Sequence, residues 1–167
     1  MSFSAKELIK MAKERKKICL ISSSGGHFEQ LLMLKPLGEK HDILIVTERT
    51  KYNKKDKTIK YRVAQVNRKE IFFIPKMIAI ALKSLYIIIK ERPDVIISTG
   101  VLAAIPMLFL GHLFRKKVVY IESFAKISSP TMTGKLVYKK KWAGQFYVQW
   151  ESMKEFYPDA ICVGGIY

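Results

Sequence analysis

Short apolar runs alternate with longer segments in which apolar residues recur every three or four positions. The short runs predict strands at residues 17–22, 42–47, 94–98, 117–122, 145–149 and 160–163, with a further short strand at 61–64. The longer segments predict helices at residues 27–37, 74–90, 101–114, 133–140 and 151–157. Because strands that alternate with helical crossovers pair in parallel, the pattern predicts a doubly wound, mainly parallel α/β sheet.

The loop after the first predicted strand is rich in small residues and reads Ser-Ser-Ser-Gly-Gly-His over residues 22–27. Small residues let backbone amides approach a ligand, and a helix start adds partial positive charge, so Ser24, Gly25 and Gly26 are candidate contacts for a phosphate or carboxylate. A plain tight turn is the alternative. The loop lacks both the dinucleotide glycine spacing and a Walker-type Lys-Ser/Thr, which disfavours NAD and simple nucleotide hydrolysis.

In sheets of this kind, ligands bind beyond the carboxyl ends of the strands. That edge is predicted to carry the glycine loop together with residues 47–49, 99–100 and 122–123. The lysine-rich stretch 51–60, which follows residues 47–49, is expected to be a flexible, solvated loop.

Composition fits one folded domain with an anionic partner. The chain has 167 residues, of which 49% are hydrophobic, and 30 basic against 14 acidic residues give a formal charge of +16. This charge indicates a phospholipid surface, a phosphorylated substrate, nucleic acid or an acidic protein. Cys19 and Cys162 are predicted to be reduced core thiols of a cytosolic protein, and we expect neither a metal site nor a cofactor.

Two segments are candidates for contact with an anionic membrane. Residues 1–16 predict a basic amphipathic helix with Leu8 and Met11 on its apolar side, preceding a domain at 17–167; its charges disfavour a signal peptide and export. Residues 71–90 are apolar on most sides, which suggests shallow insertion through Phe72 and Phe73. Lysines 76, 83 and 90 form one stripe there, so Lys76 and Lys83 would lie at headgroup level. The alternative for residues 1–16 is packing on the domain. The alternative for residues 71–90 is burial by a protein partner.

Several short motifs occur in a fixed order after the glycine loop. They are Glu-Arg-Pro-Asp-Val-Ile-Ile at 91–97, Tyr-Ile-Glu-Ser at 120–123, Thr-Gly-Lys at 133–135 and Val-Gln-Trp at 148–150. With them the chain, over about residues 17–165, resembles the membrane-associated subunit of two-component glycosyltransferases. That family includes the accessory subunit of the eukaryotic dolichol-linked N-acetylglucosaminyltransferase and bacterial counterparts in capsule and exopolysaccharide synthesis.

The resemblance implies a split GT-B enzyme, with this chain as its Rossmann-like, N-terminal, acceptor-side half on the cytoplasmic face of the cell membrane. A second subunit would carry the nucleotide-sugar site, and the chain's end just after a final strand is where a fused relative would continue. The implied reaction is inverting transfer of a hexose from a UDP-sugar to a polyprenyl-diphosphate-linked sugar. Residues 98–101 read Ser-Thr-Gly-Val where eukaryotic members have Asn-Gly-Pro-Gly, and no acidic residue stands near 143–144, so the bacterial branch is favoured.

The same resemblance assigns candidate site residues. His27 is the first candidate for the catalytic base, and the alternative is that it caps the helix or binds the diphosphate. Glu122 is the second candidate, and the alternative is that it fixes the following loop through a hydrogen bond or ion pair. Expected substrate contacts are Ser24, Gly25, Gly26, Gly100, Ser123, Thr133, Gly134 and Lys135, and expected partner contacts are Gln149, Trp150 and Tyr167. A non-catalytic scaffold for the partner is the nearest alternative function. A basic nucleic-acid-binding module is the more distant one, and no nucleic-acid motif is present.

Overall fold

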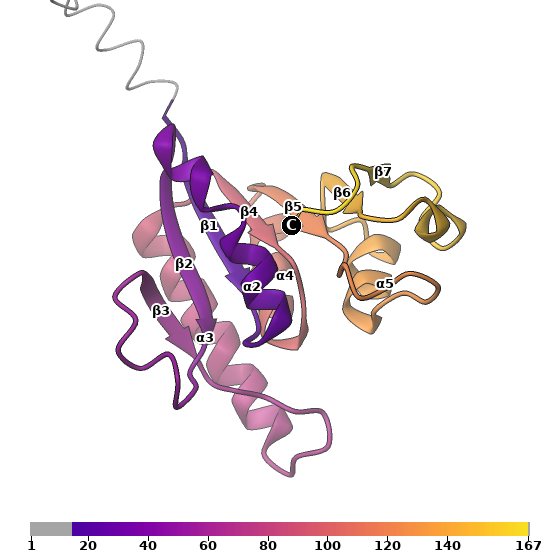
Figure 1. Cartoon of the computed structure of the whole chain (residues 1–167). Helices are drawn as coiled ribbons and strands as arrows, with labels where there is room; N and C mark the ends of the chain where they lie inside the picture. Colours follow the sequence, from indigo (N-terminus) through magenta and orange to yellow (C-terminus); the bar gives the residue numbers. More distant parts are fainter. Residues whose placement is uncertain (1–14, 167) are drawn as a thin grey trace, which may run out of the picture.

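The computed structural model describes residues 15–166, which form one seven-stranded sheet flanked by helices (Figure 1). All pairings are parallel, and the strand order is β3-β2-β1-β4-β5-β6-β7. The strands are β1 (Lys17–Ser22), β2 (Asp42–Glu48), β3 (Ile59–Val63), β4 (Val95–Ser98), β5 (Lys117–Ile121), β6 (Gln145–Val148) and β7 (Ile161–Cys162). The order reverses between β1 and β4, and this switch point is where such sheets bind ligands. The predicted parallel, Rossmann-like α/β fold is confirmed.

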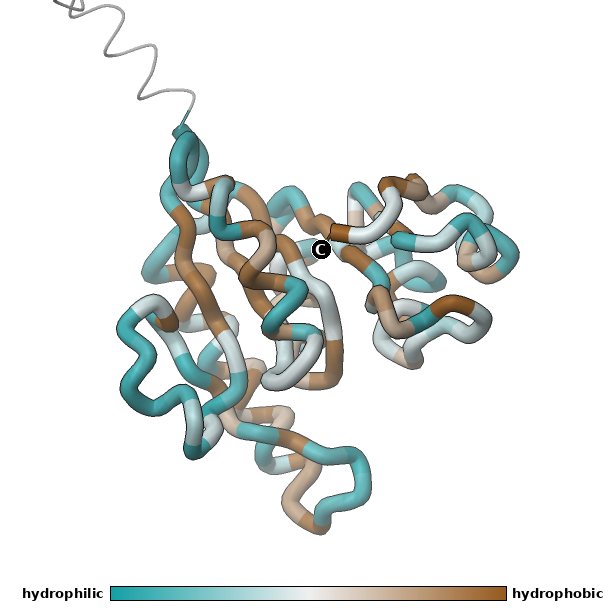
Figure 2. The backbone as a smooth tube through the Cα atoms, viewed as in Figure 1, coloured by the Kyte–Doolittle hydropathy of each residue, from teal (hydrophilic) through white to brown (hydrophobic). Residues whose placement is uncertain are grey.

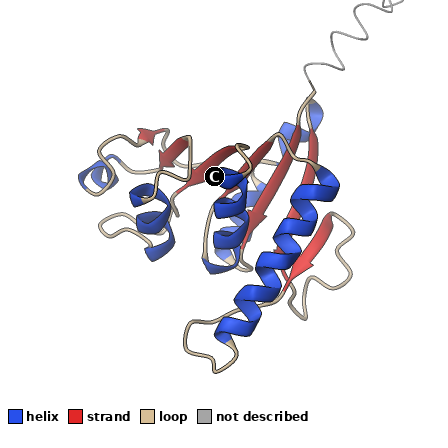
Figure 3. Ribbon diagram, turned by 180° about the vertical axis from the view of Figure 1, so that it is seen from behind, coloured by secondary structure: helices blue, strands red, loops and turns tan. Residues whose placement is uncertain are grey.

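The helices cover both faces of the sheet. Helices α3, α4 and α5 lie on one face, whereas α2 lies on the other (Figures 1 and 3). Their bounds are α2 (Gly26–Leu32), α3 (Phe73–Glu91), α4 (Ile105–Leu113) and α5 (Met132–Lys139), with 3₁₀ turns η1 (Lys35–Glu39), η2 (Leu102–Ala104) and η3 (Glu151–Glu155).

Strand β1 contributes to the core on both faces of the sheet, because alternate side chains of a strand point to opposite faces. Cys19 and Ile21 pack in the cluster shared with α3 and α4, whereas Ile18 and Leu20 pack in the cluster that includes Leu31 of α2. Hydrophobic positions are concentrated along the central strands (Figure 2). Both faces of β1 are therefore dry, as its uninterrupted apolar sequence predicts.

Three predicted helices are interrupted or wound differently. The helix predicted at 27–37 divides into α2 and η1, because Pro36 has no N–H to donate to the Leu32 carbonyl oxygen and so cannot continue α2. The helix predicted at 101–114 begins as η2, and α4 starts only where Pro106 takes a first-turn position that needs no N–H donor. The segment predicted as a helix at 151–157 is the 3₁₀ turn η3.

The lysine-rich stretch 51–60 is tied to the fold at several points. The Arg62 guanidinium donates to the carbonyl oxygens of Asn53 at 2.7 Å and Asp56 at 2.6 Å. The Asn53 amide donates to the Glu48 carbonyl oxygen at 2.7 Å. These bonds fix the backbone of the stretch to the fold, whereas most of its side chains are exposed to solvent, as its composition predicts.

The predicted helix at 1–16 falls almost wholly outside the described residues, as do the candidate contacts Leu8, Met11 and Tyr167. Within residues 15–166, each helix is too short or too polar to cross a bilayer.

Candidate functional site

The loops after β1 and β4 meet at the switch point through His27 and Thr99. The His27 Nδ1 atom lies 2.8 Å from the Thr99 carbonyl oxygen, and the Thr99 hydroxyl donates to the His27 carbonyl oxygen at 2.7 Å. Because a carbonyl oxygen only accepts, Nδ1 is the ring nitrogen that carries a hydrogen, so the neutral tautomer compatible with this bond has its lone pair on Nε2. No described residue accepts from or donates to Nε2, so this half-buried ring is oriented as a proton acceptor.

Gly100 lies beside the His27 imidazole, and its backbone conformation requires a glycine. Its φ of 95° lies in the left-handed region that favours glycine, and a Cβ there would stand 3.6 Å from His27 Nδ1 and 3.3 Å from the Tyr120 hydroxyl. Its carbonyl oxygen accepts from the Ser23 amide at 3.1 Å. Gly100 is buried, which corrects its prediction as a direct substrate contact: it shapes the floor beneath His27.

Glu48, at the carboxyl end of β2, holds the glycine loop. One of its oxygens accepts from the Ser24 amide at 3.1 Å and the Ser24 hydroxyl at 3.0 Å, and the other accepts from the Val66 amide at 3.3 Å. Glu48 is buried, and the sequence singled it out only as part of the ligand-facing edge. Both polar groups of Ser24 are thus already bonded inside the chain, so its backbone position, rather than its hydroxyl, bears on the site.

Gly25 and Gly26 are exposed, and Gly25 lines a cavity of about 650 Å³. Neither would bring a Cβ within 4 Å of another group, and Gly25 has a φ of 81°. The cavity is lined by the glycine loop and by polar and aromatic side chains, including Phe28, Glu29, Tyr52, Asn53 and Asp56. The glycine loop therefore borders an open recess, lined by both polar and aromatic side chains, at the predicted edge of the sheet.

The Glu122 carboxylate, only 1% exposed, lies inside the fold. It accepts from the Tyr157 hydroxyl at 2.6 Å, the Thr131 hydroxyl at 2.9 Å and the Thr131 amide at 3.2 Å. Burial and the adjacent carboxylate raise the pKa of Tyr157, so its hydroxyl keeps the proton that it donates. This geometry favours the alternative to a catalytic base: Glu122 fixes the loop that ends at Thr131.

The Thr-Gly-Lys motif lies in the first turn of α5, and its first two residues face the interior. Thr133 and Gly134 are buried, and a Cβ on Gly134 would stand 2.1 Å from Glu122 Oε2 and 2.5 Å from the Tyr157 hydroxyl. Ser123 is also buried. The burial of these three residues corrects their prediction as substrate contacts, and close packing against Glu122 accounts for Gly134. Lys135 is the exposed residue of the motif.

Gln149 is likewise an internal residue. Its amide donates to the Glu122 carbonyl oxygen at 2.9 Å, and its own oxygen accepts from the Ile166 amide at 3.1 Å. A buried amide with these contacts presents nothing to a partner, which corrects that prediction. Trp150 is half-buried, its ring lies against Phe124 at 4.9 Å between centroids, and its indole N–H donates to the Phe124 carbonyl oxygen at 2.7 Å.

Helix α3 presents an apolar stripe to solvent. The stripe consists of exposed residues on one side of the helix, namely Ile74, Ile78, Leu82, Tyr86 and Ile89. Phe72 is exposed just before the helix, whereas Phe73 is half-buried and packs against the core. Lys76 pairs with Glu70 at 2.6 Å, and Lys83 lies 5.7 Å from the Tyr61 ring centroid.

Both cysteines are free, and burial raises the pKa of Cys19 to about 12. Within residues 15–166, no group of three His, Cys, Asp or Glu side chains could hold a metal ion.

Sequence relatives agree on one family. The family model described as "Oligosaccharide biosynthesis protein Alg14 like" matches residues 18–166. The UDP-N-acetylglucosamine transferase subunit ALG14 of Homo sapiens is 26% identical over 184 residues, which cover 92% of this chain and 84% of the relative. The subunit of the same name from Candida albicans is 30% identical over 102 residues, 58% of this chain and 46% of the relative.

Solved structures share the fold. MurG of Acinetobacter baumannii superposes with a TM-score of 0.67 at 16% identity, over 82% of this chain and 42% of its own. The UDP-GlcNAc 2-epimerase of Methanocaldococcus jannaschii gives 0.63 at 15% identity, over 83% and 41%. The chain thus spans about two fifths of the length of these two proteins. Because the family model covers nearly all of the described residues, the chain belongs to the Alg14-like family of oligosaccharide biosynthesis proteins.

Proposed function

We propose that the chain is the acceptor-side subunit of a UDP-N-acetylglucosamine transferase and that a second polypeptide supplies the nucleotide-sugar site. The single observation that carries this proposal is the imidazole of His27, anchored through Nδ1 to Thr99, with no hydrogen bond to Nε2 from residues 15–166. Relatives named as UDP-N-acetylglucosamine transferase subunits support the donor and the subunit role. The alignment with about two fifths of MurG agrees with one half of a GT-B enzyme.

The proposed reaction is inverting transfer to a polyprenyl-diphosphate-linked sugar. Nε2 of His27 removes the proton of the acceptor hydroxyl as that hydroxyl attacks the anomeric carbon, and the Thr99 carbonyl orients the ring and stabilises the imidazolium that forms. Departing UDP is stabilised by positive charge and amides at the cleft shared with the partner. Glu122 acts by holding the neighbouring loop.

The recess beside Gly25 is the proposed place for the acceptor. Carbohydrates bind through hydrogen bonds to polar side chains and through packing on aromatic rings. Asn53, Asp56 and Glu29 supply the former, while Phe28 and Tyr52 supply the latter. Gly25 and Gly26 would receive the diphosphate, and Lys135 offers an exposed cation on α5.

We also propose that the chain is a peripheral membrane protein on the cytoplasmic face. The exposed apolar stripe of α3 supports this placement, because water-facing aliphatic side chains along one helix side favour burial in an interface. The capsule or exopolysaccharide setting stays a prediction, since the human and fungal relatives described above carry no such description.

The proposal is tested by combining the purified chain with a companion subunit, UDP-N-acetylglucosamine and a polyprenyl-diphosphate sugar. We expect product only from the combination, and we expect His27→Ala to lower kcat by about 10² to 10⁴ with an unchanged circular dichroism spectrum. His41→Ala is the control, because the His41 side chain makes one hydrogen bond among the residues described, from the Lys16 amide at 3.4 Å. Full activity of the chain alone would contradict the split enzyme. If His27→Ala lowered kcat by less than tenfold, His27 would not be the base, and the alternative of a non-catalytic scaffold would be favoured.

A further inference from the structure

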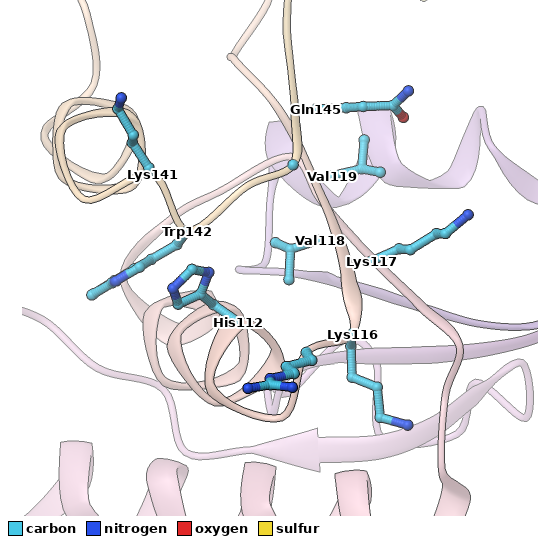
Figure 4. Close-up of a pocket in the computed structure, with 10 residues that line it drawn as sticks. His112, Lys116, Lys117, Val118, Val119, Lys141, Trp142 and Gln145 are labelled. Atoms are coloured by element: carbon cyan, nitrogen blue, oxygen red, sulfur yellow. The ribbon is translucent and has the colours of Figure 1, made fainter.

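A second recess lies at the opposite edge of the sheet from His27. Its volume is about 590 Å³, and it opens between the starts of β5 and β6 (Figure 4). Its lining includes the basic residues His112, Arg115, Lys116, Lys117 and Lys141, together with Trp142. No acidic residue belongs to this lining, so the recess concentrates positive charge.

The cations of this recess have no counter-ion within the described part of the chain. Arg115, Lys116, Lys117 and Lys141 take part in none of its ion pairs. At the same edge, Glu91 is already shared by two other lysines, and Asp94 accepts from the Lys17 amide at 2.8 Å. Like charges held around one hollow attract an anion from solution, because their fields add there.

The same type of helix C-terminal cap, at the ends of α4 and α5, brings these basic residues together. Arg115 follows α4 with a φ of 54°, and Lys141 follows α5 with a φ of 53°. The next residues close both helix ends: the Lys116 amide donates to the Gly111 carbonyl at 2.8 Å and the Trp142 amide to the Val137 carbonyl at 3.1 Å. This motif ordinarily places glycine in the left-handed position. Here both positions hold long cations, which also complement the negative ends of the helices.

An apolar surface adjoins the basic recess. Phe109, Leu113 and Phe114 are exposed on and just after α4, and the Phe109 ring packs against Trp142 at 5.3 Å between centroids. Helix α4 also packs beside α3, which carries the apolar stripe. A soluble phosphate would use the cations alone, whereas a phospholipid would use the cations for its headgroup and the aromatic and aliphatic side chains for its acyl region.

We propose that this recess binds the phosphate headgroup of an anionic phospholipid. The phosphate lies among Arg115, Lys116, Lys117 and Lys141, while Phe109, Leu113 and Phe114 enter the interface beside it. The site is separate from the His27 edge and does not depend on the transferase proposal.

The test compares two triple variants of the full chain in sedimentation with vesicles. The recess variant carries Lys116→Gln, Lys117→Gln and Lys141→Gln, and the control carries Lys54→Gln, Lys55→Gln and Lys57→Gln in the exposed stretch between β2 and β3. Both lose three charges. With vesicles of phosphatidylcholine containing phosphatidylglycerol, we expect the recess variant to bind at least about tenfold more weakly than the control. Circular dichroism and thermal unfolding verify that both variants fold.

The remaining arms distinguish a lipid site from general charge and from free phosphate. Vesicles of phosphatidylcholine alone should bind the parent weakly, and calorimetric titration with inorganic phosphate should give no more than millimolar affinity. Equal loss in both triple variants, or undiminished binding in both, would overturn the proposal. So would a recess variant that loses affinity for inorganic phosphate while it still binds anionic vesicles, because the recess would then hold a free anion.

Discussion

Two buried carboxylates, Glu48 and Glu122, organise the loops at the ligand-facing edge. Each lies at or just beyond the carboxyl end of a strand, and each accepts hydrogen bonds from a neighbouring loop. A buried carboxylate is stable only when such donors satisfy it. Their burial explains why these acidic residues shape the loops of the candidate site from inside the fold, whereas Nε2 of His27 has no hydrogen-bond partner among residues 15–166.

The packing of Gly134 against Glu122 can be tested by adding one methyl group. We expect Gly134→Ala to lower the free energy of unfolding by about 2 to 4 kcal/mol, because its Cβ would overlap Glu122 Oε2 and the Tyr157 hydroxyl. Urea denaturation measures the change. Gly26→Ala is the matched control, since no atom lies within 4 Å of its Cβ position; it should stay within about 1 kcal/mol of the parent. Similar losses in both variants would contradict this account.

Glu91 should make stability depend on pH. Bonds from the Tyr61 hydroxyl and from Lys60 and Lys17 lower the pKa of Glu91 to about 2, against about 4.3 in an unfolded chain. Its contribution is therefore present above about pH 4.3 and is lost as the pH falls toward 2. Glu91→Gln should lower the free energy of unfolding at pH 7 by about 1 kcal/mol, since the lysines are partly exposed.

The measurement for Glu91 is the difference in unfolding free energy between parent and variant at pH 7, 4 and 3. This difference should shrink as the pH falls. Glu151→Gln serves as the control, because its bond to Lys154 is exposed and should contribute less than about 0.5 kcal/mol. A difference that is constant from pH 7 to 3 would rule out the proposed linkage.

Among the elements, α3 is apolar on two separate sides. Ile80, Ile87 and Ile88 are buried against the sheet, whereas Ile78 and Leu82 face solvent. The sequence shows more apolar residues than one buried helix side needs, and α3 can bury only the side that packs against the sheet. The second side is therefore left for another surface, as the membrane proposal requires.

The two sides of α3 should differ sharply in stability experiments. Ile80→Ala, at a position 1% exposed, should lower the free energy of unfolding by about 2 to 5 kcal/mol by leaving a cavity. Ile78→Ala, at 56% exposure, should change it by no more than about 0.5 kcal/mol. Both changes alter helix propensity equally, so chemical denaturation without lipid isolates burial. Comparable effects at the two positions would show that α3 packs differently.

At the scale of the whole molecule, the sheet order brings distant segments to one site. His27 and Thr99 are separated by 72 positions in the chain, yet they exchange two hydrogen bonds. They meet because β1 and β4 are adjacent although two strands and a long helix intervene. The site therefore depends on the integrity of the central strands.

The accessibility of Cys19 reports on that integrity. Cys19 is fully buried in β1 and its pKa is raised to about 12, so in Cys162→Ser protein the remaining thiol should react with a disulfide reagent only through global unfolding. Its rate should rise with urea in parallel with the unfolded fraction. Cys19→Ser protein, with Cys162 half-buried on the edge strand β7, is the comparison and should react in native buffer. Rapid native reaction of Cys19 would contradict cooperative opening.

The alternation of apolar strands and helices was enough to predict the α/β class, the positions of most elements and the edge that carries the glycine loop. These features follow from local periodicity, which each segment expresses by itself. Which polar residues face the site was decided by tertiary structure. Glu122, Gly134 and Gln149 occur in motifs that suggest ligand contact, yet each is buried against polar groups contributed by other segments. The orientation of a side chain at a strand end depends on those distant partners, and its own sequence neighbourhood does not contain them.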